Sequence, residues 1–185
     1  MNPNIEDSLV EAIDKNRRIS TKDRDTSVFL LGNGLVAKGY EYSEEAVDEY
    51  SFGVLAYNNG ISVPKMHALE HNKIGKYNSF VIMDYIPGKS LEDIRGAQFR
   101  RALELQVVEL EKVFKLGISP ADSIRYDCAI YNPALDKIVI VDLALWSRYK
   151  REIEADRAFL EKYYRAARRN KGHGNLLFMT RAPLS

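Results

Sequence analysis

The stretch "LGISPADSIRYDCAIYNPALDKIVIVDLA", which runs from Leu116 to Ala144, decides how this chain is interpreted. Its second half is typical of a β-hairpin, because two short apolar runs flank the turn sequence "PALDK". Asp122 and Asp127 precede the hairpin, and Asp142 follows the apolar run "IVIV". An acid that ends a buried strand is expected to cap a turn or to meet a cation, since an unpaired buried charge is costly.

Composition limits the classes of protein to which the chain can belong. Its 185 residues fit one domain or two small lobes around a cleft. A net charge of +1 predicts no broad attraction to nucleic acid, and the single cysteine, Cys128, excludes an internal disulfide. No apolar run approaches the ~20 residues that a membrane span needs, and the amino terminus lacks a Sec-type signal. We therefore expect no nucleic-acid partner and no membrane span. We also expect a monomer.

The first half of the chain has the texture of a β-sheet. The segments "RRIS", "SVFLLG" and "LVAKGY" predict three antiparallel strands, with Asn33 and Gly34 as a hairpin turn. "ISVPKMHAL" and "NSFVIMDYI" predict two more strands, which completes a sheet of five. Residues 1–16 predict an amphipathic helix that precedes this sheet. Its apolar side is expected to consist of Ile5, Leu9, Val10 and Ile13.

Residues 43–60 predict a helix between the third and fourth strands. Ser43 is the expected N-cap, and Gly60 is expected to follow the last turn. The apolar positions that predict its buried stripe are Val47, Tyr50, Val54 and Tyr57.

The second half has a helical character. After the turn "PGKS", the segment "SLEDI" predicts a short helix and residues 97–117 predict a long one. The expected buried side of the long helix consists of Leu103, Val107, Leu110 and Phe114. A basic helix over residues 148–172 follows the hairpin, and Trp146 is expected to pack it. The chain is therefore predicted to be an α+β protein with a helical extension over 1–16, a β-rich part over 17–87 and a helix-rich part over 88–185.

This order of elements resembles the two-lobed protein-kinase fold, in which a five-stranded antiparallel sheet with one helix precedes a helical lobe. "LVAKGY" resembles the lysine motif of the third strand of that fold. The resemblance implies that Lys38 binds the α- and β-phosphates of ATP and that Glu49 pairs with it, with Glu45 as the alternative partner. "FVIMDYIPGKS" resembles the hinge, which implies that Met83, Asp84 and Ile86 line the adenine site.

"KLGISPAD" resembles the kinase segment in which the catalytic aspartate comes four residues after Leu-Gly-Ile. The resemblance implies that Asp122 is the catalytic base, and it completes a catalytic set with Lys38 and Glu49. It also implies that Asp127 and Asp142, the latter in "DLA", bind Mg²⁺. A second register makes Asp127 the catalytic acid and Asn132 a metal ligand, and this alternative stays open.

Three features depart from the kinase pattern. The loop "STKDRDTS" lacks the usual glycines, so Thr21, Lys22, Arg24 and Thr26 are expected to contact the phosphates through their side chains. Ala121 stands where kinases commonly have an arginine that receives a phosphorylated activation loop. The chain after Asp142 has no Ala-Pro-Glu motif and predicts a reduced helical lobe without an activation segment.

This short plan is similar to the minimal kinases that pathogenic bacteria inject into host cells, namely the OspG, NleH and HopBF groups, and it favours the HopBF type. The resemblance implies a serine/threonine protein kinase that is a type III effector. It further implies delivery into the host cytoplasm by a signal-peptide-independent route, or otherwise a cytoplasmic protein, and the host ninety-kilodalton heat-shock chaperone as a partner. The alternatives are a kinase-shaped binding module and a small-molecule phosphotransferase of the aminoglycoside- or choline-kinase type.

Overall fold

The computed structural model describes residues 3–15, 18–20 and 26–169, and it divides them into two units. The first unit contains the chain up to Ile86 together with Leu143–Leu145, and the second contains the rest. Thr21, Lys22 and Arg24, which we expected near phosphates, lie outside the described residues, as does the side chain of Thr26.

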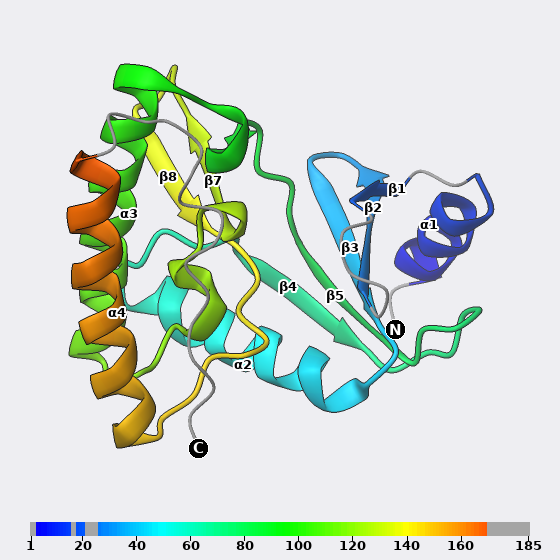
Figure 1. Ribbon diagram of the computed structural model, residues 1–185. Coiled ribbons are helices and arrows are strands. Elements are labelled where there is room, and N and C mark those ends of the chain that lie inside the picture. Colours follow the sequence, from blue (N-terminus) through cyan, green and yellow to red (C-terminus); the bar gives the residue numbers. More distant parts are fainter. Residues whose placement is uncertain (1–2, 16–17, 21–25, 170–185) are drawn as a thin grey trace. The chain divides into compact units, whose positions relative to one another are not determined.

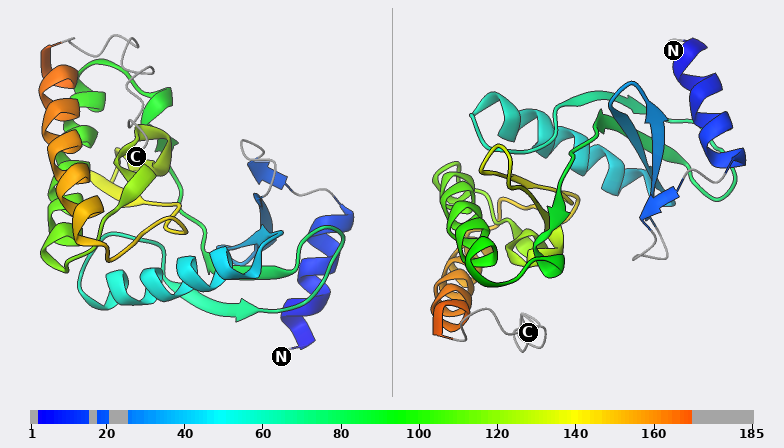
Figure 2. Two further views of the ribbon diagram at one scale, coloured as in Figure 1. Left: turned by 60° about the horizontal axis from the view of Figure 1, so that its bottom comes forward. Right: turned by 90° about the horizontal axis from the view of Figure 1, so that it is seen from above.

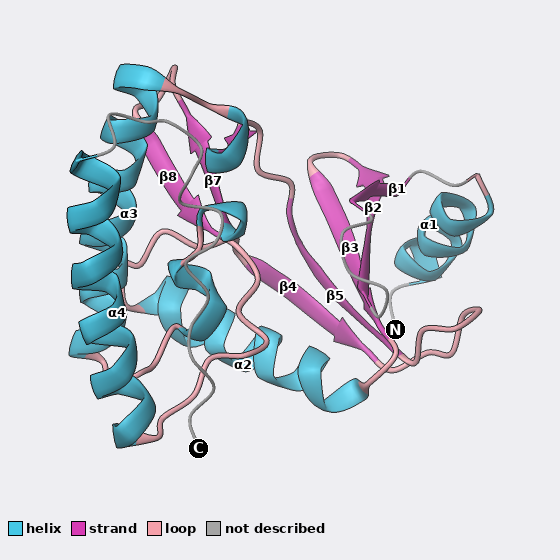
Figure 3. Cartoon of the chain, viewed as in Figure 1, coloured by secondary structure: helices cyan, strands magenta, loops and turns pink. Residues whose placement is uncertain are grey.

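The first unit is built on an antiparallel sheet with the strand order β1-β2-β3-β5-β4 (Figures 1 and 3). Its strands are β1 (Arg18–Ser20), β2 (Thr26–Gly32), β3 (Leu35–Tyr40), β4 (Met66–Glu70) and β5 (Ser79–Asp84). Asn33 and Gly34 form the β2–β3 turn with φ values of 51° and 75°, as a type I′ turn requires. The five-stranded sheet expected from the sequence is confirmed.

Helix α1 (Pro3–Asp14) covers one face of this sheet (Figure 2). Leu9 and Ala12 are buried with one set of sheet side chains, which consists of Phe29, Ala37, Tyr77, Phe80 and Ile82. Val10, which we placed on the apolar side of α1, is 39% exposed, so that part of the expectation is wrong. The helix that precedes the sheet thus contributes to the core of the first unit.

Helix α2 (Ser43–Asn58) packs on the opposite face of the sheet, and its buried stripe differs from the expected one. The buried residues are Ala46, Glu49, Gly53 and Ala56. Val47 and Tyr57 are 40% and 47% exposed. Small side chains let α2 lie close to β4, because a Cβ atom at Gly53 would stand only 2.7 Å from Cγ of Met66.

The expected cap of α2 is also wrong. Tyr42 is the N-cap residue and makes no side-chain capping bond, while Ser43 is the first residue of the helix. The Ser43 hydroxyl instead accepts a hydrogen bond of 2.7 Å from Ser79 Oγ of β5. Glu44 and Glu45 lie in the first turn, where the helix dipole favours acids. Gly60 follows the helix with a φ of 71°, as expected.

The second unit combines a three-stranded sheet with two long helices. The sheet contains β6 (Lys89–Ser90), β7 (Ala129–Asn132) and β8 (Lys137–Ile140), so the expected hairpin is confirmed. Helices α3 (Gly96–Lys115) and α4 (Lys150–Arg169) lie side by side (Figures 1 and 2). Leu103, Leu110 and Phe114 are buried on α3 as expected, whereas Val107 is only half-buried.

Three short 3₁₀ helices complete the second unit: η1 (Leu91–Asp93), η2 (Ala121–Ile124) and η3 (Tyr126–Cys128). Ser90 caps η1, where its hydroxyl accepts a hydrogen bond from the Glu92 amide. Throughout the described part of the chain, no helix combines the length and the apolar character needed to cross a membrane.

Candidate active site

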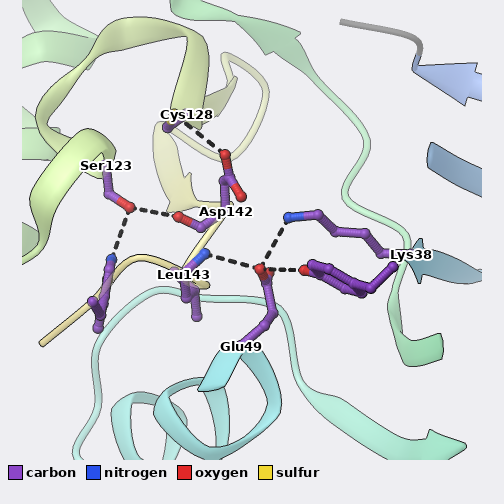
Figure 4. A network of polar contacts seen from close by, with 8 residues as sticks. Lys38, Glu49, Ser123, Cys128, Asp142 and Leu143 are labelled. Atoms are coloured by element: carbon purple, nitrogen blue, oxygen red, sulfur yellow. Dashed lines mark hydrogen bonds and ion pairs between the residues drawn. The ribbon is translucent and has the colours of Figure 1, made fainter. Parts of the chain in front are cut away.

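A buried ion pair joins β3 to α2 in the first unit (Figure 4). Lys38 Nζ lies 2.9 Å from Glu49 Oε2, and the two side chains are only 9% and 1% exposed. Side chains alternate along β3, so Lys38 faces α2 while its neighbour Ala37 faces α1. Glu45, the alternative partner, lies half-buried in the first turn of α2. The structure thus brings together Lys38 and Glu49, and their catalytic role stays a prediction.

Two further donors share the same oxygen of Glu49. The Tyr40 hydroxyl donates to Glu49 Oε2 at 2.6 Å, and the backbone amide of Leu143 donates to it at 3.1 Å. Burial, and then the charge of Glu49, holds the pKa of Tyr40 well above its usual value, so the phenol stays a donor at physiological pH. Our sequence reasoning missed Tyr40, although its position two residues after Lys38 places it on the same face of β3.

Two acids of the second unit lie beside Arg125. Asp122 lies in η2 and Asp127 in η3, and the guanidinium of Arg125 approaches their carboxylates at 3.8 Å and 2.7 Å. The Asp122 side chain is 46% exposed and that of Asp127 is 21% exposed. A water-exposed carboxylate on Asp122 suits a group that must reach an incoming hydroxyl.

Asp127 and Asp142 both contact the thiol of Cys128. The sulfur lies 3.7 Å from Asp127 Oδ1 and 3.9 Å from Asp142 Oδ2, and Figure 4 shows the second contact. Burial, and then the charges of Asp142 and Asp127, raises the pKa of the thiol, so Cys128 is a neutral weak donor rather than a nucleophile. The two carboxylates thus lie near one another around a single buried side chain.

These carboxylates suit Mg²⁺, which binds oxygen ligands and commonly uses one or two protein carboxylates together with substrate phosphates. Among the described residues, no group of three or more His, Cys, Asp or Glu side chains is arranged to hold a metal ion. A magnesium site here would therefore need oxygen ligands from the substrate in addition to Asp127 and Asp142.

The backbone is strained beside two of the acids. Ala121, which precedes Asp122, has a φ of 45°, and Asp142 has a φ of 67°. A non-glycine residue with positive φ is uncommon, and such conformations gather at functional sites. The Asp142 carbonyl accepts a hydrogen bond of 2.7 Å from Ser123 Oγ, which in turn accepts one of 2.8 Å from the buried Trp146 indole (Figure 4 labels Ser123 and Asp142).

A buried acid of α4 holds the strained backbone before Asp122. Asp156 is fully buried, and its Oδ2 accepts hydrogen bonds from the Ser119 hydroxyl and from the Ala121 amide, the latter at 3.0 Å. Asp156 belongs to the basic helix that the sequence predicts over residues 148–172. No local pattern distinguishes it, because its partners lie 35 and 37 positions away in the chain.

The side chain of Asn132 serves the hairpin. Its Oδ1 accepts hydrogen bonds from the amides of Ala134 and Leu135, and its Nδ2 donates to the carbonyl of Pro87. The oxygen of this amide is thus engaged by the β7–β8 turn, and its nitrogen is engaged by Pro87, which precedes β6.

The expected hinge residues lie at the end of β5. Met83 is buried, whereas Asp84 and Ile86 are partly exposed. The Asp84 amide donates to the Lys65 carbonyl at 3.1 Å, so this amide is already engaged within the first unit. The Asp84 carboxylate contacts His67 Nε2 at 2.7 Å.

Comparison of the sequence with protein-family models and with curated proteins finds no match. Solved structures, in contrast, do resemble the structure of this chain. The crystal structure of WbdD at 2.2 Å superposes with a TM-score of 0.60 at 15% identity over 78% of this chain and 36% of that protein. Another structure, of the bifunctional kinase-methyltransferase WbdD, gives a TM-score of 0.58 at 14% identity over 80% of this chain and 41% of that protein. The kinase PK-1 of the Cydia pomonella granulovirus gives 0.52 at 22% identity over 78% and 57% of the two chains.

The chain has a protein-kinase-like fold. It spans between 36% and 57% of the lengths of these structures. At such low identities the likeness concerns the fold alone, so activity and substrate must be argued from the residues of this chain.

Proposed function

We propose that the chain is an ATP-dependent serine/threonine protein kinase, which transfers the γ-phosphate of ATP to a protein hydroxyl. The observation that carries this proposal is the buried Lys38–Glu49 ion pair. Desolvating two charges costs about as much as their attraction returns, and apolar residues of the same size commonly stabilise a core equally well. A buried pair is thus better explained by work on a ligand, here the neutralisation of phosphates by the Lys38 ammonium.

Lys38, Glu49 and Asp122 have proposed roles that contacts within their own units support. Lys38 donates to the α- and β-phosphates, and Glu49 holds its ammonium. Asp122 accepts the proton of the acceptor hydroxyl as the γ-phosphoryl group leaves ADP and bonds to the oxygen. Its position is supported by the Asp156 contact with the Ala121 amide. We assign the base to Asp122 rather than Asp127, because the second register requires Asn132, which is engaged by the turn.

The remaining roles are also proposals. Asp127 and Asp142 would hold Mg²⁺, which when bound neutralises phosphate charge. Met83, Asp84 and Ile86 would contact the adenine, and Thr21 and Lys22 would contact phosphates in place of a glycine-rich loop. The support is the resemblance of their segments to those of kinases.

We further propose that the acceptor is a host protein, with the ninety-kilodalton heat-shock chaperone as the first to test, and that the chain acts as an injected effector of the HopBF type. The support is the resemblance of its segments to those of the minimal effector kinases, with Ala121 in place of the arginine that receives a phosphorylated activation loop. An assay with the purified chaperone and with a chaperone-depleted host lysate separates this acceptor from other proteins.

To test the activity, the purified chain is incubated with γ-labelled ATP, Mg²⁺ and host lysate. We expect label in a protein band and a loss of at least about 100-fold in Asp122→Asn and in Asp142→Asn. Asp48→Asn, which changes an exposed acid of α2, is the matched control and should keep full activity. Excess Mg²⁺ should partly restore Asp127→Asn but not Asp122→Asn, which separates a metal ligand from the base.

Two outcomes would contradict the proposal. Label in a small metabolite rather than in protein would indicate a small-molecule phosphotransferase. A chain that neither binds nor consumes ATP would be a kinase-shaped binding module.

A further inference from the structure

Tyr40 makes two separate contacts with the Lys38–Glu49 pair, all within the first unit. Its hydroxyl donates to the oxygen of Glu49 that binds the Lys38 ammonium. Its ring lies beneath the same ammonium, with Nζ 5.2 Å from the ring centroid. Tyr40 is fully buried, so water does not compete for either contact.

We propose that Tyr40 is a positioning residue for Lys38: its hydroxyl fixes Glu49 Oε2 at the point where the ammonium binds, while the face of its ring attracts the same ammonium. A carboxylate held by one lysine alone would retain several side-chain rotamers. Here the Tyr40 hydroxyl and the Leu143 amide both restrict the carboxylate. The lysine is therefore held before any nucleotide binds, which reduces the entropy lost on binding.

The hydrogen bond and the ring can be removed separately. Tyr40→Phe keeps the ring and removes the hydroxyl, whereas Tyr40→Leu removes both. Tyr77→Phe is a matched control, because Tyr77 is a buried phenol on the opposite face of the same sheet and donates to Ser27 Oγ at 2.6 Å. A loss that came from weakening the sheet in general would appear in both phenylalanine variants.

The kinetic arm of the test rests on the proposed function. Lys38 would bind phosphates in the ground state and in the transition state alike, so poorer positioning should raise the KM for ATP more than it lowers kcat. A hydrogen bond to a charged group is strong enough that we expect KM to rise roughly tenfold in Tyr40→Phe. Tyr40→Leu should add a few-fold more through the lost cation–π contact. Tyr77→Phe should leave KM within about twofold of the wild type.

A second arm needs no nucleotide. NMR of the full chain with labelled tyrosine should show one slowly exchanging phenol proton, shifted downfield by a charged acceptor, which is absent in Tyr40→Phe. Its shift should move in Glu49→Gln and also in Lys38→Met, because the ammonium and the phenol share one oxygen. The phenol resonance of Tyr77 should stay in place in both variants.

The two arms separate the two proposals. If the wild type transfers phosphate while Tyr40→Phe and Tyr77→Phe have equal KM values, the positioning role is wrong and the kinase proposal stands. If the wild type uses no ATP, the kinase proposal fails, and the NMR arm still decides Tyr40. A Tyr40 resonance that ignores the Lys38→Met substitution would then overturn the inference.

Discussion

The buried pair of Lys38 and Glu49 allows a quantitative test of the claim that it is retained for function. Removing one member of a buried pair leaves the other charge without its partner, which typically costs about 3–5 kcal/mol of unfolding free energy. The exposed fractions of 9% and 1% leave little solvent to screen that charge. We therefore expect Lys38→Met and Glu49→Gln each to lower the free energy of unfolding by about 3 kcal/mol or more.

The double variant Lys38→Met/Glu49→Gln should recover most of this loss. A glutamine carbonyl still accepts from the Tyr40 hydroxyl and the Leu143 amide, and methionine occupies nearly the volume of lysine. We expect its stability to lie within about 1.5 kcal/mol of the wild type, so the coupling in the cycle is several kcal/mol. The same variant should have no phosphotransferase activity, which would separate stability from function.

Urea unfolding followed by far-UV circular dichroism measures these four free energies. The single tryptophan, Trp146, belongs to the second unit, so its fluorescence shows whether that unit unfolds separately. Glu11→Gln and Lys15→Met form a control cycle, because this pair lies in the same unit with side chains 48% and 60% exposed. Its coupling should not exceed about 0.5 kcal/mol. A Lys38–Glu49 coupling no larger than that of the control would refute the reasoning.

Four further outcomes follow from packing, backbone geometry and charge. Leu9→Ala should destabilise the first unit by about 2–5 kcal/mol in the same urea assay, because Leu9 is buried between α1 and the sheet. Gly88→Ala should lower the free energy of unfolding by about 2 kcal/mol or more, because the new Cβ would lie 2.6 Å from the Tyr131 carbonyl oxygen and the φ of Gly88 is 158°. A variant as stable as the wild type would show that the backbone shifts easily there. Asp156→Asn should lower phosphotransferase activity without abolishing it, which kcat measurements check. Tyr40 holds its proton more tightly folded than unfolded, so its stabilising contribution is present below pH 10.0 and is lost as pH rises through its raised pKa. The stability of Tyr40→Phe should therefore fall less steeply above pH 10 than that of the wild type.

The sequence by itself determined most secondary elements and their order. Period-2 alternation, the Asn33–Gly34 turn and the long apolar period of α3 are local signals, because each element forms from neighbouring residues. The kinase-like plan followed from that order together with a few short motifs. Within the site, the resemblance to kinase motifs implied the pair of Lys38 and Glu49 that the structure shows, with Glu45 as the alternative.

Only the tertiary structure decided which faces are buried and which polar groups meet. The period of α2 allows two stripes, one of Val and Tyr and one of Ala, Glu and Gly, and local hydrophobicity favoured the wrong one. Close approach of α2 to Met66 selects the small residues instead. Hydrogen-bond partners 9 to 37 residues away along the chain determine what three polar side chains do, namely those of Tyr40, Asp156 and Ser123. Hydrogen bonds of this kind depend on how distant segments fold against one another. The local sequence places Tyr40 on the same face of β3 as Lys38, but it does not identify the partner of Tyr40, Asp156 or Ser123.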